Sequence, residues 1–523
     1  MADNNGYSSK WSPALSVPWA SAPGRIETEM ADLMVYGEIP KEIDGTFYRI
    51  MADPFYPPSP ENSIPIEGDG HVSAFRICNG QVDMKTKYVD TERLKLERKA
   101  NRRLFGLYRN PFTHHPCVRA AVDSTANTNM VYWAGRLLAL KEVALPYEID
   151  PNTLDTIRYD PFEGQVAAKT FTAHPKVDPY TDELVVFGYE AKGLASLDIV
   201  IYALNKKGQK QDEQWIELPY CAMVHDCAIT PDFIILVLWP FEAELERLKA
   251  GEHHWAWNPN RPATFVVTPR RSGKYLPKGW KVGESRVYEW DNCIALHTAG
   301  AWQEDEGEVL YMESSRVFDN ELPFFPATDG GRAMPPPTPT GKADFVRWKF
   351  DLSRPSSSRI TDPQVILDVP SEFPRIDERF MTRPYTHLFL DVVLGPSSGP
   401  GVIPSLNGLA MLNTATRKTV FYNPGENCHV EEPVFIPRHK DATQGDGWVL
   451  AMVERKSTNL SELVVLDTRD FGRPTALIRL PYRIRGQIHG NWVPSEQLGE
   501  RRSLVRELGD VQISGRGALE SDM

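Results

Sequence analysis

The sequence predicts an all-β protein, on three observations. Short runs rich in Val, Ile, Phe and Tyr, separated by turn residues, cover nearly the whole chain from about residue 34. The 43 prolines and 36 glycines interrupt any helical periodicity. Long Pro-rich stretches at 326–341 and 394–404 are typical of functional loops over one face of a scaffold. These features favour a sandwich, a barrel or a propeller, and a propeller here would have degenerate blades because no 40–50-residue period is visible.

The predicted strands follow one another along the chain, each with β-branched or aromatic residues at its centre. They are GTFYRI (45–50), HVSAFRI (71–77), NMVYWAGRLLAL (129–140), ELVVFGYEA (183–191), LDIVIYAL (197–204), DFIILVLW (232–239), ATFVVTP (263–269), EVLYMES (308–314), KTVFYNP (418–424), GWVLAMVE (447–454) and SELVVLD (461–467). One helix is predicted at 241–255, where Glu and Lys/Arg recur at i,i+4 spacing.

We expect a single domain over residues 21–495. Residues 1–20 are polar and contain Pro and Ser, so they are predicted to form a flexible N-terminal arm. Residues 496–523 are charged and free of aromatic side chains, which predicts a loose C-terminal tail.

Composition excludes several partners. A formal net charge of −12 argues against nucleic acid. The six cysteines form no C-x-x-C pair, and the N-terminus has no secretory pattern, so we expect reduced thiols and a cytoplasmic location. The longest apolar run, 233–241, falls far short of the ~20 residues of a spanning helix, and no stable membrane insertion is expected.

Four histidines that are far apart in the chain share one setting, a short apolar or small-residue stretch that is typical of a strand end. They are His174, His225, His297 and His489. A single buried histidine is more often structural, but the same setting four times favours one convergent metal site. Imidazole suits iron, copper, zinc and nickel, and a site with few carboxylates and no thiolates favours a redox metal with open positions.

Three glutamates lie in apolar or Pro-framed runs: Glu142, Glu372 and Glu432. A metal-bound histidine usually donates its second N–H to a carboxylate, so these residues are candidate partners of the histidines. The alternative is that each is a strand-end residue that faces water.

Around these residues the chain resembles the carotenoid cleavage oxygenase family. The motifs are EGDGHV (67–72), TANTN (125–129), LPYEIDP (145–151), EFPRIDERF (372–380) and EEPVFIPR (431–438), in addition to the four histidine motifs. The resemblance covers roughly residues 34–495. It implies a seven-bladed β-propeller, with loops and short helices capping one face over a central site that holds one Fe(2+) per chain, and O2 as co-substrate.

The resemblance also implies roles for individual residues. His174, His225, His297 and His489 would hold the iron, and Glu142, Glu372 and Glu432 would each bond one of the last three histidines. Thr128 of TANTN would lie near the open coordination position, where its methyl group limits access.

At two positions the sequence resembles the stilbene-cleaving subgroup of this family. Tyr108 and Lys141 are implied to contact the 4-hydroxyl of the substrate. A lysine beside a buried strand is costly unless it meets an acceptor, which an ionising phenol supplies; the alternative is a lysine whose amine reaches solvent. Phe55 and Tyr56 are predicted to stack on the phenyl ring.

The expected activity is cleavage of the central C=C of a phenolic stilbene of the resveratrol or piceatannol type, with O2, into two aromatic aldehydes. The alternative on the same iron site is cleavage of a carotenoid or apocarotenoid, which the charged helix expected at 241–255 disfavours. From other classes, a non-catalytic propeller would need no buried ligand set, and in a zinc hydrolase four protein ligands would close the tetrahedral site.

Overall fold

The computed structural model describes residues 23–57, 64–271, 275–304, 307–318, 320, 322, 324–328, 343–395 and 406–506. The predicted arm at 1–20, most of the loops at 326–341 and 394–404, and the tail from 507 onward lie outside the described residues.

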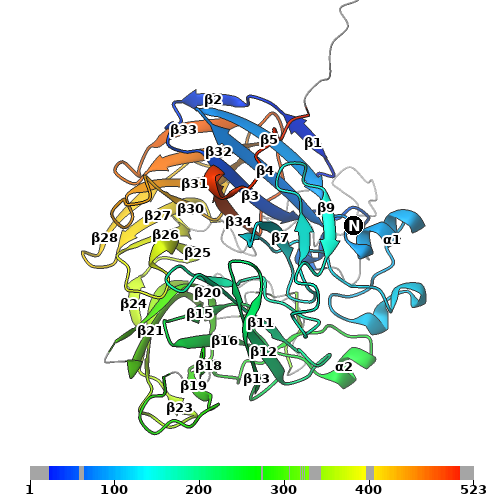
Figure 1. Ribbon diagram of the computed structural model, residues 1–523, viewed down its shortest axis with the longest axis vertical. Coiled ribbons are helices and arrows are strands. Elements are labelled where there is room, and N and C mark those ends of the chain that lie inside the picture. Colours follow the sequence, from blue (N-terminus) through cyan, green and yellow to red (C-terminus); the bar gives the residue numbers. More distant parts are fainter. Residues whose placement is uncertain are drawn as a thin grey trace, which may run out of the picture.

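The described strands form seven sheets that follow one another around a central axis in chain order (Figure 1). The first sheet contains, in hydrogen-bonded order, β1 (Thr28–Met30), β5 (Gln81–Tyr88), β4 (Gly70–Cys78), β3 (Gly45–Ala52) and β34 (His489–Pro494). The second contains β6 (Asn129–Trp133), β7 (Arg136–Leu140), β8 (Tyr147–Ile149) and β9 (Thr156–Tyr159). The third contains β10 (Lys176–Asp178), β11 (Glu183–Tyr189), β12 (Asp198–Asn205) and β13 (Lys210–Glu217).

The remaining four sheets complete the ring. The fourth contains β14 (Ala222–Met223), β16 (Phe233–Glu242), β18 (Ala263–Pro269), β19 (Arg286–Trp290) and β23 (Ser358–Arg359), with β15 (Cys227–Ile229) and β17 (Ala256–Trp257) paired to β16. The fifth contains β20 (Ile294–Glu304), β21 (Val309–Val317), β22 (Ala343–Asp351) and β24 (Gln364–Leu367). The sixth contains β25 (Ser371–Ile376), β26 (His387–Val392), β27 (Gly408–Asn413) and β28 (Lys418–Tyr422). The seventh contains β2 (Met34–Gly37), β33 (Pro474–Arg479), β32 (Leu460–Asp467), β31 (Gly447–Arg455) and β29 (Cys428–Val430), with β30 (Val434–Pro437) paired to β31.

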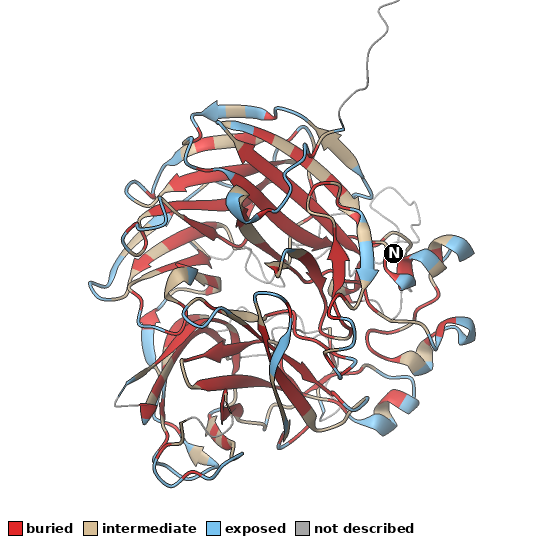
Figure 2. Ribbon diagram, viewed as in Figure 1, coloured by how far each residue is buried: buried red, intermediate tan, exposed pale blue. Residues whose placement is uncertain are grey.

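Strands from the two ends of the described chain close the ring. β34 pairs antiparallel with β3, with Ile50 opposite His489, and β2 pairs antiparallel with β33. Figure 2 shows that the sheets are buried over most of their area and exposed mainly at the outer edges and loops. The prediction of an all-β propeller is therefore confirmed, and every predicted strand run contains a strand.

The described residues form few helices, of which the two α-helices lie outside the ring of sheets (Figure 1). They are α1 (Glu92–Ala100) and α2 (Leu245–Lys249), with the 3-10 turns η2 (Pro65–Glu67), η3 (Pro111–Thr113), η4 (Pro116–Val118), η6 (Glu378–Phe380) and η7 (Ser495–Gln497). Among the described residues, none of these elements has the length and apolar character needed to cross a membrane.

The helix predicted at 241–255 is wrong in extent, because only Leu245–Lys249 is helical. Phe241 and Glu242 continue β16 and pair with Trp257 and Ala256. Burying Phe241 in the sheet outweighs a surface charge pattern whose stabilising effect is a few tenths of a kcal/mol per pair. The argument against a carotenoid substrate that used this helix therefore loses its basis.

The beginning of the predicted tail is packed rather than loose. Leu504 is fully buried, and its carbonyl oxygen accepts a hydrogen bond from Lys85 Nζ (3.0 Å). Asn152 Oδ1 accepts a hydrogen bond from the Arg502 backbone (3.1 Å). One buried leucine and these backbone contacts hold a segment whose composition alone suggested disorder.

Candidate metal centre

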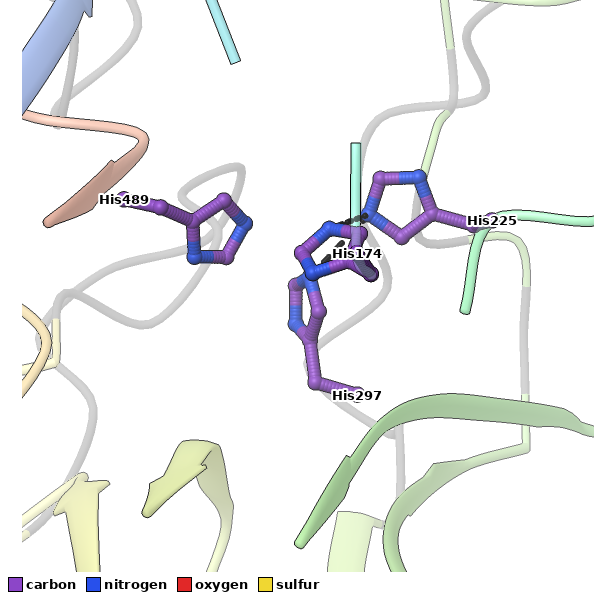
Figure 3. Close-up of side chains that lie close together, drawn as sticks. All are labelled: His174, His225, His297 and His489. Carbon is purple, nitrogen blue, oxygen red and sulfur yellow. Dashed lines mark hydrogen bonds between the residues drawn. The ribbon is translucent and has the colours of Figure 1, made fainter. Parts of the chain in front are cut away.

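The four predicted histidines lie close together (Figure 3). Their candidate ligand nitrogens all lie within 4.8 Å of one another. His174 precedes β10, His225 lies between β14 and β15, His297 lies where the register of β20 shifts, and His489 is the first residue of β34. Segments in or next to strands of four different sheets thus each contribute one imidazole.

The spacing of the imidazoles fits a single metal ion. His225 Nε2 lies 3.1 Å from His174 Nε2 and 3.0 Å from His297 Nε2. Two metal–nitrogen bonds of about 2.1 Å at right angles place their nitrogens roughly 3 Å apart. His489 Nε2 is buried and has no hydrogen-bond partner among the described residues. A nitrogen whose lone pair is kept for a metal is expected to lack such a partner.

Each of three histidines has a glutamate on its other ring nitrogen. His225 Nδ1 contacts Glu142, His297 Nδ1 lies 2.7 Å from Glu372 Oε2, and His489 Nδ1 lies 3.2 Å from Glu432 Oε1. A carboxylate at Nδ1 favours the tautomer in which Nδ1–H donates and Nε2 keeps its lone pair for a metal.

Backbone donors fix two of these carboxylates as well. Glu372 Oε1 accepts from the backbone N–H of His297 (3.1 Å), and Glu432 Oε2 accepts from that of Gly490 (2.9 Å). Each carboxylate therefore holds both the ring and the backbone of its own histidine segment, which orients the imidazole.

Electrostatics favour neutral imidazoles at two of the four positions. Burial, followed by the charges of the other three histidines, lowers the pKa of His174 well below its usual range. Burial also lowers the pKa of His489, against the opposing effect of Glu432. Neutral imidazole is the form that binds a metal.

Two aromatic rings, which the sequence analysis did not single out, cover the histidines. Phe373 stacks on His297, with ring centroids 5.2 Å apart, and adopts φ of 53°. Trp239 lies 4.8 Å from His225 and donates from its indole N–H to the carbonyl of Ala295 (2.7 Å). These rings restrict the orientation of the imidazoles and keep their surroundings apolar.

Lys141 and Tyr108 come together as the sequence predicts. The Lys141 amine lies 5.1 Å from the centre of the Tyr108 ring, and both side chains are buried, which excludes the alternative of a lysine that reaches solvent. Burial lowers the pKa of Lys141 to about 8, although the charge of Glu142 acts in the opposite direction. Burial, followed by the charge of Glu142, raises the pKa of Tyr108 above its usual range.

Asn127 orients Lys141, a role that the sequence analysis missed. Its Oδ1 accepts from Lys141 Nζ (3.0 Å) and from Thr128 Oγ1 (3.1 Å), while its Nδ2 donates to the carbonyls of Ile66 and Gly68. The TANTN motif itself contains this signal, because Asn127 directly precedes Thr128.

A hydrogen-bonded chain joins the Tyr108 turn to the histidines. Arg109 donates to the Tyr189 hydroxyl (2.6 Å), which donates to Glu142 Oε2 (2.9 Å), and Glu142 Oε1 contacts His225. Arg109 also pairs with buried Glu190 and adopts φ of 54°. The left-handed turn lets the adjacent side chains of Tyr108 and Arg109 face different partners.

Phe55 and Tyr56 lie beside α1. Phe55 contacts the Tyr88 ring (centroids 5.4 Å apart) and lies under the Arg98 guanidinium (4.6 Å). The Tyr56 hydroxyl approaches Asn101 Oδ1 (3.5 Å). The structure therefore does not group these two rings with Tyr108 and Lys141 through any contact between described residues.

The family model described as retinal pigment epithelial membrane protein (RPE65) matches residues 21–494, which is most of the chain. The chain belongs to the RPE65/carotenoid cleavage oxygenase family. Its relatives include resveratrol cleavage oxygenase 1 of Botryotinia fuckeliana, 60% identical over 98% of this chain and 91% of the relative. Resveratrol cleavage oxygenase 1 of Aspergillus fumigatus is 42% identical over 92% of this chain and 96% of the relative.

A solved structure of the family has the same fold. The lignostilbene dioxygenase of Pseudomonas brassicacearum superposes with a TM-score of 0.85 at 39% identity, covering 93% of this chain and 100% of that chain. The family resemblance in the sequence is therefore confirmed, and the protein is an oxygenase of this family.

Proposed function

We propose that this oxygenase is an Fe(2+)-dependent dioxygenase that cleaves the central C=C of a 4-hydroxystilbene with O2 to give two aromatic aldehydes. The observation that carries the proposal is the buried Tyr108–Lys141 group, which is joined through Glu142 to four converging histidines. Such a group suits a substrate with an ionisable phenol, and a plain polyene offers it no partner.

In this proposal His174, His225, His297 and His489 hold one iron ion per chain. Four neutral imidazoles and no anionic ligand leave the ion its full charge, and the bound iron would supply the binding and activation of O2. Glu142, Glu372 and Glu432 orient three of the ligands, and Thr128 limits access to the open position.

The chain's own groups position the phenol. Lys141, held by Asn127, and Tyr108 contact the 4-hydroxyl, and the neutral amine of Lys141 takes its proton. The resulting phenolate pushes electron density through the conjugated ring into the central double bond, which makes the alkene more reactive toward oxygen. Burial of the group excludes water and strengthens these contacts. Stacking of Phe55 and Tyr56 on the phenyl ring is retained only as a prediction.

Two similarities support the stilbene substrate. The relatives named resveratrol cleavage oxygenase reach 60% identity, and the superposed structure is a lignostilbene dioxygenase.

We further propose that each of the seven sheets is one propeller blade within a single catalytic domain, 21–495. Six free cysteines favour a cytoplasmic location.

The test is an assay of anaerobically iron-loaded protein with three substrates: resveratrol, its 4-O-methyl ether and an apocarotenal. We expect O2-dependent formation of aldehydes from resveratrol only, read by chromatography. Cleavage of the apocarotenal in place of resveratrol would reassign the substrate and keep the metal centre. A protein that binds no iron after reconstitution would support a non-catalytic propeller.

A further inference from the structure

A small cavity adjoins the Tyr108–Lys141 group. Its volume is about 10 Å³, and its wall includes Tyr108, Lys141, Glu67, Arg93 and Thr125. A cavity of this size has room for about one water molecule, and a water is held there only where two to four polar atoms converge.

The wall supplies such atoms. Glu67 Oε1, Arg93 Nε and Thr125 Oγ1 are all buried and have no hydrogen-bond partner among the described residues. Burying a polar atom without a partner is energetically costly, and three such atoms around one cavity point to a shared partner inside it. A single water in the cavity would accept from Arg93, donate to Glu67 and exchange a hydrogen bond with Thr125.

Glu67 is held so that one carboxylate oxygen remains available. Its Oε2 accepts from Arg103 Nη2 (3.1 Å), whereas Oε1 has no partner among the described residues. The Arg103 side chain is 14% exposed and the Glu67 side chain 3%, so the pair leads from the cavity toward solvent. After burial and the charges of Glu142 and Arg109, the charge of Glu67 is the next strongest influence on the pKa of Lys141, which it raises.

We propose that Glu67 accepts, through a water held in this cavity, the proton that Lys141 has taken from the phenol during turnover. The inference rests on the proposed function. Lys141 that has taken the phenolic proton is a buried cation beside Arg93 and Arg109, and passing one proton on relieves that repulsion.

The proton transfers balance without an oxidant or reductant. The O–H bond of the 4-hydroxyl breaks, its electron pair stays on the phenolic oxygen, and its proton binds the lone pair of the Lys141 amine. The ammonium donates one proton to the water, which donates one of its own to Glu67 Oε1. The phenolic aldehyde product takes a proton back by the same path, so turnover consumes none.

Glu67→Gln tests this role because the amide keeps the shape and the acceptor for Arg103 but takes no proton. Glu246→Gln, on exposed α2, is the matched control. We expect anaerobic binding of resveratrol to iron-loaded protein to stay within about twofold in both variants. In Glu67→Gln, kcat should fall about tenfold or more with KM little changed, and its solvent deuterium isotope effect should rise because proton transfer becomes rate-limiting. Glu67→Asp should restore part of kcat.

Three results would overturn the role of Glu67: a kcat of Glu67→Gln within twofold of wild type, a fall in kcat with an unchanged isotope effect, or a tenfold weaker binding of resveratrol that accounts for the loss. Should Glu67→Gln not fold, Thr125→Val removes one partner of the water and keeps every charge. It should lower kcat about threefold with the same rise in isotope effect, and normal values would likewise overturn the role. Wild-type protein that neither binds nor cleaves resveratrol would instead remove the proposed function, and this inference with it.

Discussion

At the scale of single residues, two neighbours in the chain serve two different partners. Lys141 is buried against Tyr108 and Asn127, and Glu142 contacts His225. Because the two residues are adjacent, the phenol group and the histidine centre share one short backbone segment after β7. A substitution at Lys141 is therefore expected to separate substrate activation from metal binding.

Lys141→Met should lower cleavage of resveratrol at least 100-fold while iron content stays near that of wild type. Methionine fills a similar volume but has no amine to take the phenolic proton. Turnover is measured by aldehyde formation and iron by elemental analysis, with exposed Lys249→Met as control. Unchanged turnover would remove Lys141 from the mechanism.

The pKa of Lys141, lowered to about 8, sets a pH dependence. Only the neutral amine accepts a proton, so kcat/KM should rise about tenfold per pH unit below 8 and level off above it. At pH 7 roughly one molecule in ten has the neutral amine. A profile that is flat from pH 6.5 to 9, measured on resveratrol, would contradict this role.

His297→Ala should leave the protein with about a tenth or less of wild-type iron. The change removes one of four candidate ligands and leaves half-buried Glu372 without its imidazole partner. Iron per chain after anaerobic reconstitution is the measurement, and His115→Ala, an exposed histidine, is the control. Full occupancy in His297→Ala would mean that the ligand set is wrong.

At the scale of elements, the hairpin of β6 and β7 builds the phenol group. Asn129 pairs with Leu140, and Thr128 N–H donates to the Leu140 carbonyl, so the residues just outside both strand ends lie opposite each other. Those residues are Thr128 and Lys141, and Asn127, one residue further out, accepts from Lys141 Nζ with its side-chain oxygen (3.0 Å). The register of one hairpin thus places the lysine and the amide that orients it.

The segment after η7 is a second element whose importance is structural. Leu504→Ala should reduce the free energy of unfolding by roughly 2–4 kcal/mol, since the side chain is fully buried in the first part of the predicted tail. A lower denaturant midpoint with unchanged iron content and kcat is expected. Exposed Val365→Ala should change neither, and an unshifted midpoint for Leu504→Ala would show that the segment contributes little.

At the scale of the whole molecule, the propeller depends on closure between distant segments. β34 pairs with β3, although the two strands are more than four hundred residues apart in the chain, and it contributes His489. The last strand therefore both closes a sheet and completes the histidine centre. Pairing with β34 also covers the edge of β3, which would otherwise lie open and favour aggregation.

A chain that ends at Gln487 should therefore aggregate and retain no stoichiometric iron, whereas a chain that ends at Arg506 should match the full chain. The first lacks β34 and the second keeps it together with Leu504. Size-exclusion chromatography and iron analysis distinguish them. Monodisperse, iron-loaded protein from the shorter chain would show that closure by β34 is dispensable.

Local information in the sequence accounts for the correct predictions. Each strand run is recognisable from a few consecutive residues, because β-branched and aromatic residues bounded by turns favour extended backbone. The four histidines and three glutamates were identified from their settings and from the family motifs. The same local reasoning overlooked α1, although Thr91 caps it and its residues favour a helix.

The sequence by itself determined the strands, the chemical types gathered at the centre and the family. Only the tertiary structure decided that Asn127 binds Lys141 and that Arg109 is linked through Tyr189 to Glu142. It also decided that Glu67 lines the cavity, and that Phe241 belongs to β16 instead of the predicted helix. The physical reason is the distance along the chain between the residues that interact. Backbone preference depends on neighbours in the chain, whereas each of these contacts joins segments that meet only when the sheets close into a ring.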